Sequence, residues 1–73
     1  MRNVIYKVGK DNKKQYVRMR KTLTYVQFLW TEDKSKAKIF DEENLTPEIS
    51  KQLDRFLMDC YLFHGDYFNE QIE

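Results

Sequence analysis

Residues 46–65 read TPEISKQLDRFLMDCYLFHG, and this segment decides the fold because it has every part of an amphipathic helix. Thr46 can accept a hydrogen bond from the first turn, and Pro47 suits the first helical position, where a missing N–H leaves nothing unpaired. Gly65 favours the end of the helix, because glycine readily adopts the backbone conformation found there. An apolar stripe at helical spacing consists of Ile49, Leu53, Phe56, Leu57, Cys60 and Phe63. The segment predicts a helix over about 47–63 with one buried face.

The sequence before this helix has the alternation and composition of β-strands. Residues 3–8 and 15–20 are rich in β-branched and aromatic residues and are separated by typical turn residues. Residues 25–30, YVQFLW, are apolar at all but one position, which indicates a central strand. After a polar segment expected to hold one helical turn, residues 37–40 predict a short fourth strand. The form of the tail, 66–73, is not determined by its pattern.

These segments predict one α+β domain over residues 1–73, a three- to four-stranded antiparallel meander packed on one C-terminal amphipathic helix. Strict alternation assigns the side chains to two sheet faces. The face expected to pack on the helix carries Val4, Tyr6, Val8, Val17, Met19, Val26, Phe28 and Trp30. The opposite face carries Ile5, Lys7, Tyr16, Arg18, Arg20, Tyr25, Gln27 and Leu29.

Composition indicates a small folded protein of a reducing compartment. A chain of 73 residues buries only roughly 60% of its unfolded surface, so we expect modest stability. Cys60 is the single cysteine and cannot form an internal disulfide. The N-terminal residues lack the continuous apolar segment of a signal peptide, and no stretch approaches the ~20 apolar residues of a membrane span. We therefore expect a cytoplasmic protein without membrane contact.

The residue types needed for catalysis or metal binding are scarce. Cys60 and His64 lie four positions apart on the predicted helix, which is half of a zinc site, but a structural zinc site needs about four ligands and the chain has no other Cys or His. The two isolated glycines cannot form a phosphate-binding loop. We expect no catalytic residue, no metal, no cofactor and no enzymatic activity.

The net charge of +1 conceals a strong polarity along the chain. Residues 1–21 hold eight bases and one acid, whereas residues 41–73 hold nine acids and two bases. Such a field steers encounters with charged partners. The alternative is that the two halves attract each other within the monomer, or that the charges serve only solubility.

Two candidate binding surfaces follow. The exposed sheet face suits single-stranded nucleic acid, because aromatic rings stack on bases and basic side chains hold phosphates, although ordinary cross-strand pairs also explain these residues. Its candidate residues are Lys7, Lys13, Lys14, Tyr16, Arg18, Arg20 and Tyr25. The back of the helix suits a protein partner, because an apolar centre there has a charged rim. Its candidate residues are Asp54, Met58, Asp59, Tyr61 and Leu62, with Arg55 also on the rim. The alternative for this second surface is that the tail covers it with Tyr67, Phe68 or Ile72.

Three segments resemble small accessory proteins of phages and prophages of Gram-positive bacteria: VIYKV at 4–8, QYV at 15–17 and WTEDKSKAKIF at 30–40. The resemblance covers about half the chain and implies that the last segment packs its alanine and phenylalanine under the sheet. It carries no functional residue over to this chain. It implies an accessory protein, acting in the host cytoplasm, that binds and inhibits a host protein such as a bacterial immune nuclease, which would make it an anti-defence protein.

We therefore predict a non-enzymatic binding protein that docks on a host defence or replication factor. Its acidic C-terminal half would imitate nucleic acid in a basic groove of that partner. Two alternatives stay open, a nucleic-acid-binding module that uses the basic sheet face and a structural homodimer.

Overall fold

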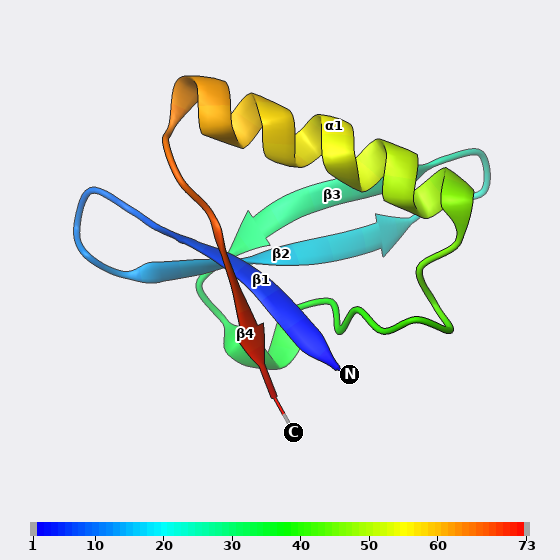
Figure 1. Cartoon of the computed structure of the whole chain (residues 1–73), viewed down its shortest axis with the longest axis horizontal. Helices are drawn as coiled ribbons and strands as arrows, with labels where there is room; N and C mark the ends of the chain where they lie inside the picture. Colours follow the sequence, from blue (N-terminus) through cyan, green and yellow to red (C-terminus); the bar gives the residue numbers. More distant parts are fainter. Residues whose placement is uncertain (1, 73) are drawn as a thin grey trace.

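The computed structural model describes residues 2–72, in which one antiparallel sheet lies under one α-helix (Figure 1). The elements in chain order are β1 (Asn3–Val8), β2 (Lys14–Lys21), β3 (Val26–Thr31), the 3-10 turn η1 (Lys34–Lys36), α1 (Pro47–Phe63) and β4 (Phe68–Gln71). The strand order β3-β2-β1-β4 makes β1 to β3 a meander, with β4 added at the outer edge of β1. The predicted α+β meander packed on a C-terminal helix is confirmed.

Helix α1 begins and ends where its end residues require. The Thr46 hydroxyl oxygen accepts a hydrogen bond from the Ile49 amide at 3.3 Å, and Pro47 opens the first turn. At the other end the amides of His64 and Gly65 both donate to the Cys60 carbonyl, at 2.8 and 3.0 Å. Gly65 has a φ of 110°, which side-chain-bearing residues rarely adopt. The predicted span 47–63 is therefore confirmed.

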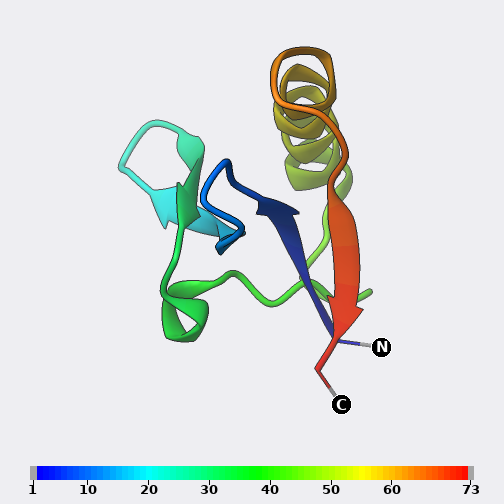
Figure 2. The same ribbon diagram turned by 90° about the vertical axis from the view of Figure 1, so that its left-hand side faces the viewer.

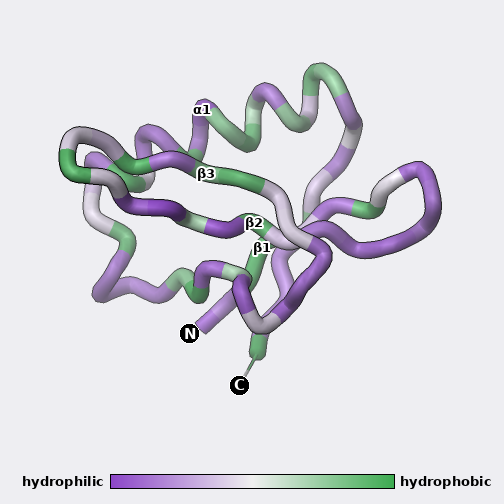
Figure 3. Tube along the Cα trace, turned by 180° about the vertical axis from the view of Figure 1, so that it is seen from behind, coloured by the Kyte–Doolittle hydropathy of each residue, from purple (hydrophilic) through white to green (hydrophobic). Residues whose placement is uncertain are grey.

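The core lies between α1 and the sheet, which form two layers in Figure 2. Its buried cluster is Ile5, Val17, Phe28, Phe40, Leu53 and Leu57. The Phe56 ring extends this cluster, with centroids 5.8 Å from Phe28 and 5.2 Å from Trp30. In Figure 3 β3 is mostly hydrophobic, whereas the turn between β1 and β2 is mostly hydrophilic. The apolar stripe of the helix thus packs on the apolar β3, as predicted.

The faces predicted for β1 are wrong by one residue. Tyr6 pairs with Tyr16, so both point away from the helix, and Ile5 shares the core face with Val17. Val4 and Ile5 are both buried, which means that β1 is covered on its two faces. An apolar strand of this kind has no alternation to set its phase, and a shift of one residue exchanges the faces of all its side chains.

The fourth strand also lies elsewhere than predicted. Residues 37–40 make only one bridge, between Asn3 and Phe40, and one further bond from the Lys38 amide to the Val17 carbonyl. This segment contacts both β1 and β2 without pairing along either. The tail instead forms β4, which pairs antiparallel with β1 from Asn3 to Tyr6. The last tail residue, Glu73, lies outside the described residues.

Phe63 is the one stripe residue that the structure places in solvent, at 78% exposure. At 100° per residue it lies at the margin of the stripe, beyond Phe56, which is itself half-buried. The last turn of α1 also extends past the end of β3 (Figure 1). None of the described helices has the length and apolar character that a bilayer span requires.

Candidate protein-binding surface on α1

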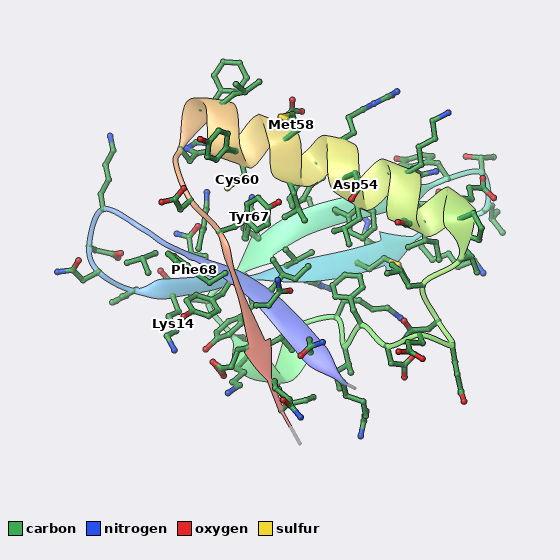
Figure 4. The ribbon with its side chains drawn as sticks, in the orientation of Figure 1. Lys14, Asp54, Met58, Cys60, Tyr67 and Phe68 are labelled. Carbon is green, nitrogen blue, oxygen red and sulfur yellow. The ribbon has the colours of Figure 1, made fainter. Side chains whose placement is uncertain are left out.

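Helix α1 presents an apolar group on the side opposite the core. Met58, Tyr61 and Leu62 are 57%, 58% and 65% exposed, although all three are large and hydrophobic. They occupy positions i, i+3 and i+4 of one helix, so their side chains adjoin. Asp54 and Asp59 are exposed beside them, and Figure 4 shows Asp54 and Met58 on α1. We call these five residues the α1 patch.

The tail does not cover the α1 patch. Phe68 packs instead on the Tyr6 ring at 5.5 Å, and the Ile72 amide donates to the Arg2 carbonyl. Tyr67 lines a hollow together with Asp54, Met58 and Tyr61, and it keeps 37% of its surface exposed. The tail therefore widens the exposed apolar surface.

Phe63 adds a second apolar group at the end of the helix. It lines a hollow with His64 and with Val8 of β1, which is 48% exposed. Sequence reasoning missed this contribution because Phe63 has helical spacing with the buried stripe. The position of Phe63 at the margin of the apolar stripe could have indicated its exposure.

The two carboxylates on the rim of the α1 patch are unpaired within the part of the chain that the structure describes. Neither Asp54 nor Asp59 makes an ion pair with any residue between 2 and 72. Exposed carboxylates of this kind are free to face the charges of a partner. With Arg55 also exposed there, the rim carries two acids and one base, as expected from the sequence.

The candidate nucleic-acid residues do not lie on one surface. Lys7 is on the helix side of β1, where its Nζ lies 4.6 Å from the centre of the Trp30 ring. Tyr16 is on the other face but buried, at 7% exposure, and cannot stack on a base. Arg18 and Arg20 share that other face of β2. Lys13 lies exposed in the β1–β2 turn and Tyr25 exposed beside the β2–β3 turn.

Lys14, the remaining basic candidate, belongs to a cluster that holds β4 in place. Its Nζ lies 4.6 Å from the Tyr6 ring centre and 3.5 Å from a carboxylate oxygen of Glu70. Lys34 of η1 donates to the other oxygen of Glu70 at 2.6 Å. This hydrogen bond lowers the pKa of Glu70 and raises the pKa of Lys34. No spacing rule in the sequence connects these three residues.

Cys60 and His64, the two residues considered as metal ligands, differ in their exposure to solvent. Cys60 is buried, and burial raises the pKa of its thiol; its Sγ lies 3.8 Å from the Gly65 carbonyl oxygen. His64 is exposed at the end of α1. Between residues 2 and 72, no three His, Cys, Asp or Glu side chains come together in a group that could hold a metal ion.

Comparisons with protein-family models, with curated proteins and with solved structures find no significant match for this chain.

Proposed function

We propose that this chain is a non-enzymatic binding protein that docks on another protein through the α1 patch. The observation that carries the proposal is the trio Met58, Tyr61 and Leu62, each more than half exposed on one helix face. An apolar group with a charged rim is how protein interfaces look, and tyrosine is a frequent anchor in them.

The charges favour a partner with a basic groove. Asp54 and Asp59 border the apolar trio, and the chain from residue 41 onward holds nine acids against two bases. Carboxylates placed in this way can occupy the positions that phosphates take in a nucleic-acid-binding groove. Together with the resemblance to phage proteins, this favours an inhibitor of a host defence or replication factor that acts in the host cytoplasm.

The basic sheet face offers less to a nucleic acid. Stacking needs exposed rings, and Tyr16 is buried beneath Tyr6 and Lys34. Lys14 is engaged by Glu70, which reduces the net positive charge of that face. Arg18, Arg20 and Tyr25 remain, and they are the residues by which nucleic-acid binding would be tested.

A capture experiment with matched variants tests the proposal. The chain is immobilised and exposed to a Gram-positive bacterial lysate, with and without nuclease. We expect one protein to be retained after nuclease treatment and lost from Tyr61→Ala with Leu62→Ala. The control is Tyr25→Ala with Leu23→Ala, since Tyr25 is 55% exposed and Leu23 fully exposed at the far end of the sheet.

Three outcomes would contradict the proposal. Equal loss of the protein from both double variants would show that the α1 patch has no special role. Loss of all captured material after nuclease treatment would favour nucleic acid. A chain that sediments as a dimer, and as a monomer only with Tyr61→Ala and Leu62→Ala, would assign the patch to a second copy.

A further inference from the structure

Two hollows lie beside the α1 patch, and each is lined by at least one residue of α1 and one of the tail that leads into and forms β4. We call these two hollows together the crevice between α1 and β4. The first is lined by Asp54, Met58, Tyr61 and Tyr67. The second is lined by Leu53, the residue before Asp54 on the helix, and by Asn69, two residues after Tyr67 in the tail. Figure 4 shows Asp54 and Met58 on α1, and Tyr67 where the chain descends into β4.

The second hollow has an apolar floor that the hydrophobic core supplies. Ile5, Phe40 and Leu53 line it, and each belongs to the buried cluster under α1. Leu45 lies at its rim and is 37% exposed. The floor is therefore fixed by core packing, and the opening is bordered by a leucine that a partner would cover.

The charges along the crevice have one sign. Asp41 and Glu42 line the second hollow, Asp54 lines the first, and no base lines either. The hollows on other faces differ, because each has lysine in its lining. One contains Lys34, another Lys21, and another both Lys7 and Lys10. This contrast selects an occupant with positive charge.

Local hydrogen bonds hold the outer wall of the second hollow. One carboxylate oxygen of Asp41 accepts from the amides of Glu43 and Asn44, at 3.1 and 2.9 Å. The Asn44 side chain in turn accepts from the Asp41 amide and donates to the Ile39 carbonyl at 2.8 Å. A wall held in this way loses little freedom on binding, which favours affinity.

The tail contributes one residue to each hollow, Tyr67 to the first and Asn69 to the second. Tyr67 and Asn69 are two residues apart along an extended segment, so they are separated by roughly 6.7 Å. Alternate side chains of an extended peptide have the same repeat. A peptide lying along β4 would therefore place side chains i and i+2 over the two hollows.

We propose that the crevice between α1 and β4 binds an extended segment of the partner protein, with apolar side chains at i and i+2 and Lys or Arg on either side. The inference rests on the proposed function, because Asp54, Met58 and Tyr61 belong to the α1 patch. It adds the chemistry of the partner's docking segment and a second anchoring hollow.

Two synthetic peptides test the crevice without knowledge of the partner. One is acetyl-Lys-Leu-Ser-Leu-Lys-amide, and the other has Glu in place of both Lys. On titration into the isotope-labelled full chain, we expect the basic peptide to shift the amide signals of Leu45, Leu53, Tyr67 and Asn69 saturably. The acidic peptide should bind about tenfold more weakly, and added salt should narrow this difference.

Matched charge-reversal variants locate the site. Leu45→Lys with Glu42→Lys should abolish binding of the basic peptide. Leu23→Lys with Glu32→Lys makes the same charge change at exposed positions that line neither hollow and should leave binding unchanged. Binding that is equal in the two variants, equal for the two peptides, or seated elsewhere would overturn the inference.

The experiment also separates this inference from the proposed function. Leu62 belongs to the α1 patch but does not line the crevice. Leu62→Ala should weaken capture of the protein partner and leave peptide binding intact. If Leu62→Ala abolishes capture and neither peptide binds, the crevice inference is overturned while the α1 patch stands. If the basic peptide binds in the crevice and no partner depends on Leu62, the proposed function fails while the crevice site stands.

Discussion

Lys34 and Glu70 are 36 residues apart in the chain, and the Lys34 Nζ lies 2.6 Å from the Glu70 carboxylate. Lys14 of β2 approaches the same carboxylate at 3.5 Å. Glu70 therefore joins β4 to both β2 and η1. The sequence of β4, FNEQ, contains no β-branched residue, so its strand propensity is weak. The contacts of Glu70 with Lys14 and Lys34, and of Phe68 with Tyr6, explain why the tail pairs with β1.

Glu70→Gln should loosen β4 while the rest of the fold survives. The charge-assisted contacts to Lys34 and Lys14 are lost, so we expect the β4 amides to exchange with solvent faster than in the wild type, while α1 amides stay protected. Hydrogen exchange followed by NMR measures this. Asp66→Asn is the control, because Asp66 is exposed and makes no ion pair between residues 2 and 72. Unchanged β4 exchange in Glu70→Gln would show that strand pairing alone holds the tail.

The same comparison has a defined pH dependence. The hydrogen bond from Lys34 lowers the pKa of Glu70, so its stabilising contribution is complete above the ordinary carboxyl pKa and is lost as pH falls through the lowered value. The pKa of Lys34 is raised, so the contact persists in alkali until pH passes that raised value. Melting temperatures of wild type and Glu70→Gln should differ at neutral pH and converge in acid. A lowered pKa of Asp33, caused by its bonds with Ser35, is common to both proteins and cancels.

Phe56 and Phe63 form a matched pair on one helix. Phe56 packs against Phe28 and Trp30, so Phe56→Ala should lower the free energy of unfolding by about 3 kcal/mol, a large share of the stability of so small a domain. Phe63 is 78% exposed, so Phe63→Ala should change it by no more than about 0.5 kcal/mol. Denaturant unfolding of both variants tests this. Equal losses would mean that the end of the helix is buried in solution.

The elements that sequence reasoning predicted well are those with strong local signals. Thr46, Pro47 and Gly65 mark both ends of α1, and the turn residues between β1 and β2 mark the first hairpin. The α1 patch was also predictable, because helical geometry places Met58, Tyr61 and Leu62 opposite the stripe whatever the sheet does.

What could not be predicted depends on contacts between distant segments. The phase of β1 is set by its register against β2, because Val4 and Ile5 are both buried and no alternation distinguishes its faces. Tyr16 is buried next to Tyr6 of β1 and Lys34 of the 3-10 turn, so no local pattern could predict its burial. The strand β4 exists because Glu70 and Phe68 meet groups far away in the chain.

Cys60 should be unreactive in the folded protein. Its side chain is buried, and burial raises the pKa of the thiol, so little thiolate is present at neutral pH. Alkylation by iodoacetamide should therefore proceed only through opening of the structure, and much faster in denaturant. Mass spectrometry over time measures the rate. Rapid native-state modification would indicate that the end of α1 opens readily and would contradict the burial of Cys60.

The acidic rim of the α1 patch should act on the rate of association. Asp54→Lys with Asp59→Lys reverses two exposed charges, so encounter with a basic partner should slow, and more strongly at low salt. Dissociation should change little because rim charges remain solvated in a complex. Binding kinetics with the captured protein, at two ionic strengths, test this. Faster association after charge reversal would mean that the partner's surface is acidic.

The apolar centre of the α1 patch should act on dissociation instead. Tyr61→Ala removes a ring that a partner would enclose, and loss of such an anchor typically costs at least ~2 kcal/mol, or about thirtyfold in affinity, mostly through faster dissociation. The stability of the isolated protein should change by no more than about 0.5 kcal/mol, because the Tyr61 ring is 58% exposed. The dissociation rate and the free energy of unfolding must be measured together, because Tyr61→Ala would lower both affinity and stability if the ring were covered. If Tyr61→Ala lowers the free energy of unfolding of the isolated chain substantially, the ring is already buried by another copy or another segment, and the patch is not a free docking surface.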